Sequence, residues 1–155
     1  MSVAFRREGD DEHKEPRFEL PLPAGPNIVT PRGKALIDAR VADLEAAIAA
    51  GGSDEAIAEH KRDLRYWSTR QSTAQVAPPA SGDEAAIGTR VTYRLRGGKP
   101  ATIEIVGHDE ADPATGKLAF ASPLARAMIG AGEGELVDFG GEEEAIEVLK
   151  VAVAD

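Results

Sequence analysis

The sequence contains no cysteine among its 155 residues, which excludes disulfide bonds, thiolate metal sites and cysteine nucleophiles. Aromatic residues make up only 5%, and the formal net charge is -9. Both values argue against a general nucleic-acid-binding surface of basic and stacking side chains, and favour a protein partner. The sequence has no apolar signal core at its start and no apolar run near the roughly 18 residues of a membrane span, so we expect a cytoplasmic protein.

The hydrophobic fraction of 42% is sufficient for one ordinary domain or two small ones. Residues 1–29 are different, because they are charged, interrupted by prolines and poor in regularly spaced apolar side chains. Such a segment gains too little from burial to offset its ordering entropy, so we predict a disordered leader and assign it no function. The alternation of Phe18, Leu20 and Leu22 leaves open an extended strand that docks on the folded part.

A first helix is predicted to begin after Thr30, which is a good N-cap, with Pro31 at the first helical position and Gly51-Gly52 as the stop. Its apolar residues are spaced by four, three and four positions, a pattern typical of a coiled-coil seam. The seam residues are Ile37, Val41, Leu44 and Ile48.

A second helix is predicted to follow at once, capped by Ser53 and stopped by Pro78-Pro79. Residues recur on one side of it at every third or fourth position: Ile57, His60, Leu64, Trp67, Gln71 and Ala74. Two matched stripes and a tight glycine turn indicate an antiparallel helical hairpin over residues 30–77. Each arm of about twenty residues would be roughly 30 Å long.

Residues 78–88 are rich in proline, alanine, glycine and serine, and are predicted to be a linker to a second domain, residues 89–155. That domain is predicted to be an antiparallel β domain with one short helix, which makes the chain α+β. The strands are expected around 91–95, 103–105, 136–139 and 146–148, with Gly97-Gly98 as a hairpin turn. The helix is bracketed by Ser122 as N-cap, Pro123 at the first helical position and Gly130 as the stop.

Several short motifs in this order resemble the GreA/GreB family of transcript cleavage factors, over about residues 30 to 152. They are Thr30-Pro31-Arg32-Gly33, Leu44-Glu45, Ser72-Thr73-Ala74-Gln75-Val76, Ile87-Gly88-Thr89-Arg90-Val91, Ile105-Val106-Gly107, Asp109-Glu110-Ala111-Asp112, Ser122-Pro123-Leu124-Ala125-Arg126 and Ile129-Gly130. The resemblance implies a hairpin joined to a carboxy-terminal domain of FKBP-like fold.

The resemblance also implies a partner, bacterial RNA polymerase. Family members insert the hairpin into the secondary channel of the polymerase, where contact with nascent RNA becomes possible, while the globular domain holds the channel rim. The positions that would hold the rim are Ser122, Pro123, Leu124 and Arg126. Ala121 stands where relatives carry Asp or Asn, and a purely structural role of Ser122 and Pro123 as a helix cap is an equal alternative.

In cleavage factors of this family, the hairpin tip carries an Asp-Leu-Ser-Glu-Asn type of motif, whose carboxylates help to hold Mg²⁺ in the polymerase active centre. That motif is absent here, and the candidate ligands at the turn are Asp54, Glu55 and Glu59. Glu55 and Glu59 lie four residues apart on one helix face, whereas neighbours diverge by about 100°. The alternative is that these acids only interact with the helix dipole, worth about 0.3 to 1 kcal/mol. No cofactor of its own is expected, apart from Mg²⁺ shared with the polymerase.

The hairpin is also shorter than in cleavage factors, with residues missing between Ala50 and Leu64, and in this it resembles the Rnk group. We therefore expect channel binding with weak or no stimulation of RNA cleavage by a monomer that is not itself an enzyme. Two other functions stay open: an Rnk-like module that regulates another protein such as nucleoside diphosphate kinase, and a prolyl isomerase. The basic side of the second helix, which includes Lys61 and Arg65, is either an RNA-facing surface or a solvated face.

Overall fold

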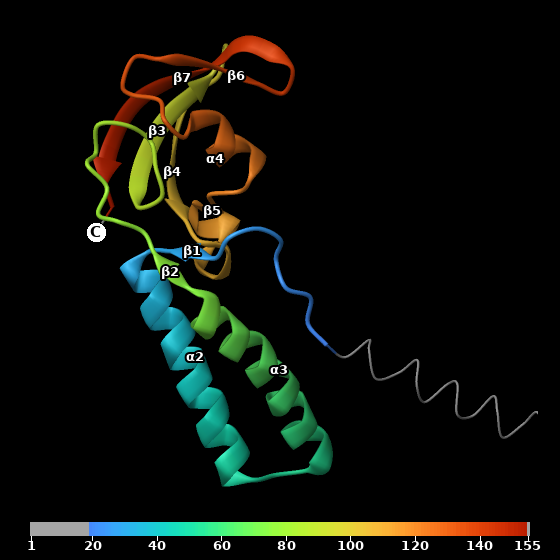
Figure 1. The fold of residues 1–155 in the computed structure, drawn as a ribbon. Coiled ribbons are helices and arrows are strands. Elements are labelled where there is room, and N and C mark those ends of the chain that lie inside the picture. Colours follow the sequence, from blue (N-terminus) through green and yellow to red (C-terminus); the bar gives the residue numbers. More distant parts are fainter. Residues whose placement is uncertain (1–18, 155) are drawn as a thin grey trace, which may run out of the picture. The chain divides into compact units, whose positions relative to one another are not determined.

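The computed structural model describes residues 19–154. Residues 1–18 of the predicted disordered leader therefore lie outside the described part. The chain forms two compact units (Figure 1). One contains residues 19–25 and Ile37–Thr73, and the other contains Pro26–Leu36 and residues 74–154. A mixed helix and sheet fold is thereby confirmed. Among residues 19–154, no helix combines the length and the apolar character that crossing a membrane requires.

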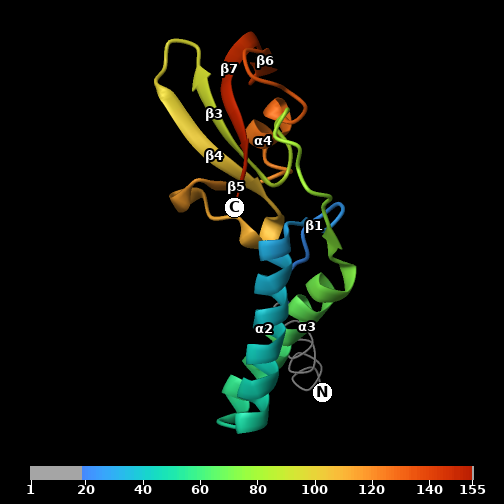
Figure 2. The same cartoon turned by 90° about the vertical axis from the view of Figure 1, so that its left-hand side faces the viewer.

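The first unit is a pair of helices, α2 (Pro31–Ala50) and α3 (Asp54–Thr73), joined by a three-residue turn (Figures 1 and 2). Gly51 enters the turn with φ of 83°, a left-handed conformation that glycine adopts without strain. Ser53 caps α3, because its Oγ accepts a hydrogen bond from the Ala56 N–H at 3.1 Å. The predicted starts and the predicted stop of α2 are confirmed, and both follow from local chemistry.

The predicted seam residues of the first helix are all at least partly buried. Ile37 and Val41 are buried, while Leu44 and Ile48 nearer the turn are half-buried. The helices also contact each other through polar groups: the Gln71 amide donates to Asp38 Oδ1 at 2.9 Å, and the Arg40 guanidinium lies 5.5 Å from the Trp67 ring centroid. A coiled coil in the strict sense stays a prediction.

Helix α3 ends at Thr73, earlier than the Pro78-Pro79 stop that the sequence predicted. The reason is a small parallel sheet of β1 (Ile28–Val29) and β2 (Gln75–Val76). The Gln75 N–H donates to the Asn27 carbonyl, and the Ala77 N–H donates to the Val29 carbonyl, both at 2.8 Å. These backbone hydrogen bonds compete with helical ones, and they also give residues 26–29, predicted as leader, an ordered place in the second unit.

The second unit is built on a five-stranded sheet in the order β5-β4-β3-β7-β6 (Figure 1). The strands are β3 (Thr89–Leu95), β4 (Pro100–Val106), β5 (Lys117–Ala119), β6 (Leu136–Phe139) and β7 (Glu142–Val153). All pairs are antiparallel except β4 with β5, so the prediction of a purely antiparallel sheet is wrong.

The parallel pair exists because the chain between β4 and β5 reverses direction twice. Two short 3₁₀ helices, η2 (His108–Glu110) and η3 (Pro113–Thr115), occupy this crossover. The sequence contained no signal for a strand as short as β5. Whether the domain is FKBP-like in detail also stays a prediction.

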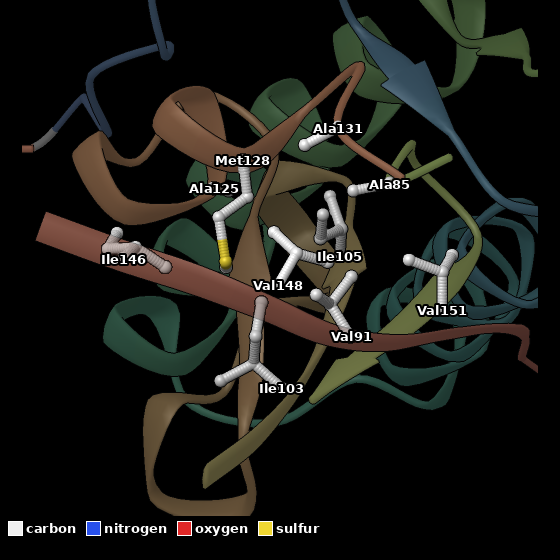
Figure 3. Close-up of a cluster of buried hydrophobic side chains, with 10 residues drawn as sticks. All are labelled: Ala85, Val91, Ile103, Ile105, Ala125, Met128, Ala131, Ile146, Val148 and Val151. Carbon is white, nitrogen blue, oxygen red and sulfur yellow. The ribbon is translucent and has the colours of Figure 1, made fainter. Parts of the chain in front are cut away.

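One helix, α4 (Pro123–Met128), covers one face of the sheet and closes the core (Figure 3). Ten buried apolar side chains meet there: Ala85, Val91, Ile103, Ile105, Ala125, Met128, Ala131, Ile146, Val148 and Val151. Ala85 belongs to the predicted linker, residues 78–88. Its N–H donates to the Ala131 carbonyl, and its own carbonyl accepts from the Gly130 N–H, both at 2.8 Å, so the end of that segment is an integral part of the domain.

Gly107 is required for steric reasons. Its φ of -78° and ψ of 173° are accessible to any residue, yet a Cβ at this position would lie 2.6 Å from the Ile28 carbonyl oxygen in β1. We expect Gly107→Ala to lower the free energy of unfolding by about 1 to 3 kcal/mol, because backbone must move to make room. Urea denaturation followed by circular dichroism measures this change.

The matched control is Gly97→Ala, where φ is 75° and no atom lies within 4 Å of the added carbon. Its cost should be backbone strain only, about 1 kcal/mol. An equal or smaller effect at Gly107 would contradict the close approach of β1.

Candidate functional site

The surface around α4 contains the predicted partner-binding residues. Ser122 caps this helix, because its Oγ accepts a hydrogen bond from the Ala125 N–H at 3.4 Å, and Pro123 follows at the first helical position. Leu124 is half-buried and packs against the core, whereas Arg126 points away from the core and is exposed. Three of the four predicted positions thus shape or anchor the helix, and the Arg126 guanidinium is exposed without an ion pair to any residue of 19–154.

Three further residues, Phe120, Ala121 and Ile129, extend this surface beyond the prediction. Ile129 directly follows α4 and is 42% exposed, a high value for a large apolar side chain. With Phe120, Ala121 and Arg126 it lines a shallow hollow of about 350 Å³. An exposed apolar side chain beside an arginine is common where proteins bind each other. The sequence could have indicated this exposure, because Ile129 does not lie on the helix face that contains the buried Ala125 and Met128.

The turn of the helical pair presents the predicted acidic residues to solvent. Asp54, Glu55 and Glu59 are all exposed, and Asp54 and Glu55 occupy the first turn of α3. The Glu59 carboxylate lies 3.8 Å from the Arg62 guanidinium, which partly compensates its negative charge. Within residues 19–154 no three histidine, cysteine, aspartate or glutamate side chains converge as a metal site would require.

This donor set fits Mg²⁺ only in part. Magnesium accepts one or two protein carboxylates while it keeps several waters, so Asp54 and Glu55 are chemically suitable ligands. Because they are exposed and adjacent, the remaining ligands would have to come from a partner. The tip by itself is therefore an acidic end with a helix-dipole role.

The basic side of α3 is largely neutralised within its own unit. Arg62 lies 3.2 Å from Asp63, and Arg65 lies 2.7 Å from Glu19. Arg70 is only 4% exposed, so its charge is not presented to solvent. Of the predicted basic residues, Lys61 is exposed and forms no ion pair with another residue of 19–154. This favours the solvated-face interpretation over an RNA-binding stripe.

A separate groove of about 450 Å³ lies within the second unit, and none of its lining side chains is aromatic. Its walls are formed by Thr30, Pro31, Arg32, Ala77, Pro78, Pro79, Ala80, Ile87, Gly88, Glu104, Val153 and Ala154. A pocket that holds a proline ring for isomerisation needs an apolar, aromatic lining. The groove therefore gives no support to a prolyl isomerase.

Sequence comparison identifies the second unit. Residues 79–153 match the family model "Transcription elongation factor, GreA/GreB, C-term". These residues contain the whole five-stranded sheet, α4 and the surface around Arg126 and Ile129. The domain is thus of the type found at the carboxy terminus of transcription elongation factors. Through it, the chain is similar to the GreA/GreB family.

Relatives support the same assignment. The chain is 41% identical over 83 residues to the transcription elongation factor GreA of Ralstonia nicotianae, covering 49% of this chain and 52% of that protein. It is 37% identical over 98 residues to GreB of Neisseria meningitidis, covering 60% of each. The chain therefore spans about half to three fifths of the curated relatives it matches.

Among solved structures, the Thermus thermophilus protein described as GreA factor homolog 1 (Gfh1) is similar to this chain. The sequence identity is 15%, the alignment covers 83% of this chain and 99% of that one, and the TM-score is 0.39. A TM-score this low does not establish a common overall arrangement.

The cap at Ser122 has a measurable energetic role. We expect Ser122→Ala to lower the free energy of unfolding by about 0.5 to 1 kcal/mol, because the Ala125 N–H loses its acceptor, whereas Ser122→Asp should retain the cap and stay near wild type. Urea denaturation of the three proteins tests this. Equal stabilities would show that Ser122 has no structural role, which would leave partner binding as the reason for its position.

Proposed function

We propose that this chain is a transcription elongation regulator that binds RNA polymerase through the surface around α4 and inserts its helical pair into the secondary channel. Transcript cleavage is stimulated weakly or not at all. The observation that carries the proposal is the GreA/GreB-type domain over residues 79–153, with Arg126 and Ile129 exposed on it. The relatives it matches are transcription elongation factors, which makes RNA polymerase the expected partner.

The helical pair supports occupancy of a narrow channel. Each helix has 20 residues, a length of about 30 Å at 1.5 Å per residue, and the turn between them needs only three residues. In this proposal Asp54, Glu55 and Glu59 approach the catalytic Mg²⁺ of the polymerase without completing its ligand set. The protein then competes for the channel with cleavage factors that have a full acidic motif.

Cleavage chemistry belongs to the polymerase in this proposal, and the chain supplies no catalyst of its own. The protein would act in the cytoplasm, where its polymerase works, and as a monomer. Contact with nascent RNA is left to Lys61 and the exposed part of Arg65, because the other arginines of α3 are paired or buried. The comparisons give no support to the Rnk-like alternative, a module that regulates another protein such as nucleoside diphosphate kinase.

Binding to the polymerase should depend on the apolar part of the α4 surface. We expect Ile129→Asp to weaken retention on immobilised core RNA polymerase by about tenfold or more, because a carboxylate replaces an apolar contact at the interface. Pull-down at micromolar concentration, with bound protein quantified on gels, measures this change.

Leu95→Asp is the matched control, because Leu95 is 44% exposed, close to the 42% of Ile129, and belongs to β3 instead of α4. It should bind as wild type does. If both variants bind equally well, the α4 surface is not the interface. Loss of retention by the wild type itself would refute polymerase binding altogether.

Cleavage is tested on a stalled, backtracked elongation complex with Mg²⁺. We expect the protein to leave the yield of short 3′ RNA products within about twofold of polymerase alone, because two exposed carboxylates do not complete a Mg²⁺ site. A triple variant of Asp54→Ala, Glu55→Ala and Glu59→Ala should behave like the wild type. Products that appear with the wild type and vanish with the triple variant would establish it as a cleavage factor.

A further inference from the structure

A buried hydrogen bond joins the start of α2 to the crossover after β4. The Thr30 hydroxyl donates to Glu110 Oε1 at 2.5 Å, across 80 residues of sequence. The same hydroxyl oxygen accepts from the Gly33 N–H at 3.0 Å, so it also caps the helix. The Glu110 side chain is 4% exposed, which places the bond out of water. We call Thr30, Gly33 and Glu110 the root clamp.

The root clamp is specific in shape as well as in charge. A Cβ at position 33 would lie 3.0 Å from Glu110 Oε1, so any other residue would force this carboxylate to shift. The second oxygen, Oε2, makes no hydrogen bond to any residue of 19–154, and Arg32 Nε lies 3.9 Å from it. A buried carboxylate that depends on one hydroxyl and one distant cation becomes costly if either leaves. The Thr-Pro-x-Gly opening and the Asp-Glu-Ala-Asp turn are therefore two halves of one contact.

The position of the root clamp in the chain gives it a functional consequence. Helix α2 is continuous over Pro31–Ala50, yet its part up to Leu36 clusters with the carboxy-terminal domain and its remainder with α3. If the first turn is released, one of the two chain connections between the helical pair and the carboxy-terminal domain becomes a flexible tether, while the other runs through Ala74 into β2. A longer tether lowers the effective concentration of the attached module at its site, steeply with length.

We propose that Glu110 is a positioning residue, which keeps the root of α2 on the carboxy-terminal domain so that the helical pair enters the polymerase channel whenever the domain is bound. This inference rests on the proposed function. It assigns the tip's occupancy of the channel to a residue far from the tip in sequence. It also separates two quantities that a general loss of stability would change together: binding of the domain, and engagement of the tip.

The chain's lack of cysteine allows both quantities to be measured in the full protein. A single cysteine with a photo-crosslinker is introduced at Ala58 near the tip or at Ala121 beside α4, and each protein is crosslinked to polymerase at saturating concentration. In the Glu110→Ala background we expect tip crosslinking to fall about fivefold or more and crosslinking from position 121 to stay within about twofold, as the tether argument requires. A variant that is merely unstable would lower both equally.

Two further variants separate the clamp from nearby charge. Glu110→Gln retains the oxygen that accepts from Thr30 and should restore most tip crosslinking, whereas Thr30→Val should reproduce the loss. The matched control is Glu104→Gln, because Glu104 also lies near Arg32, at 3.5 Å, and is similarly buried, whereas the Thr30 hydroxyl donates to Glu110 instead. It should crosslink as wild type does. A loss in Glu104→Gln equal to that in Glu110→Ala would overturn the proposal.

Hydrogen exchange of the free protein gives a readout that does not need the polymerase. Amides of residues 34–36 should exchange about tenfold faster in Glu110→Ala than in wild type, while those of residues 41–48 and β3 change little, because the opening is local. Unchanged exchange at residues 34–36 would refute the clamp. If neither wild-type cysteine crosslinks but the exchange pattern holds, the proposed function fails and the clamp is purely structural.

Discussion

The buried hydrogen bond from Thr30 to Glu110 holds the first turn of α2 to the crossover after β4, within the second unit. It places a carboxylate where water cannot reach it, with the side chain 4% exposed, and it satisfies a helix N-terminus with the same hydroxyl. Gly33 leaves space for this bond, since a Cβ there would touch Glu110. Gly107 allows the neighbouring approach of β1, since a Cβ there would meet the Ile28 carbonyl.

Few of the charged side chains described above are both exposed and available to form a binding site. The chain is strongly acidic, yet its acids at the helical turn are exposed and incomplete as metal ligands, and most arginines of α3 are paired or buried. The exposed surface around α4 is instead small and partly apolar, with Ile129 beside Arg126. This combination is suited to docking on another protein, as expected of a chain that carries a domain of the GreA/GreB type.

Much of the fold followed from local rules. The bounds of α2 and α4 came from their N-caps and glycine stops, and the strands came from alternation. The predictions that needed correction all concern partners distant in the sequence. Helix α3 ended early because β2 pairs with β1, the sheet proved mixed because β5 returns parallel to β4, and Ala85 in the predicted linker entered the core. Neither caps nor periodicity contain information about such partners.

The features of the candidate site also divide into those set by local sequence and those set by packing. The sequence alone determined that Ser122 and Pro123 begin a helix, that a glycine turn presents acids, and that no cysteine chemistry is possible, because each depends on residue type and near neighbours. Only the tertiary structure decided that Ile129 is exposed, that the arginines of α3 are neutralised and that Glu110 is buried against Thr30. Burial and ion pairing depend on which distant segments meet, and that is settled by packing of the whole chain.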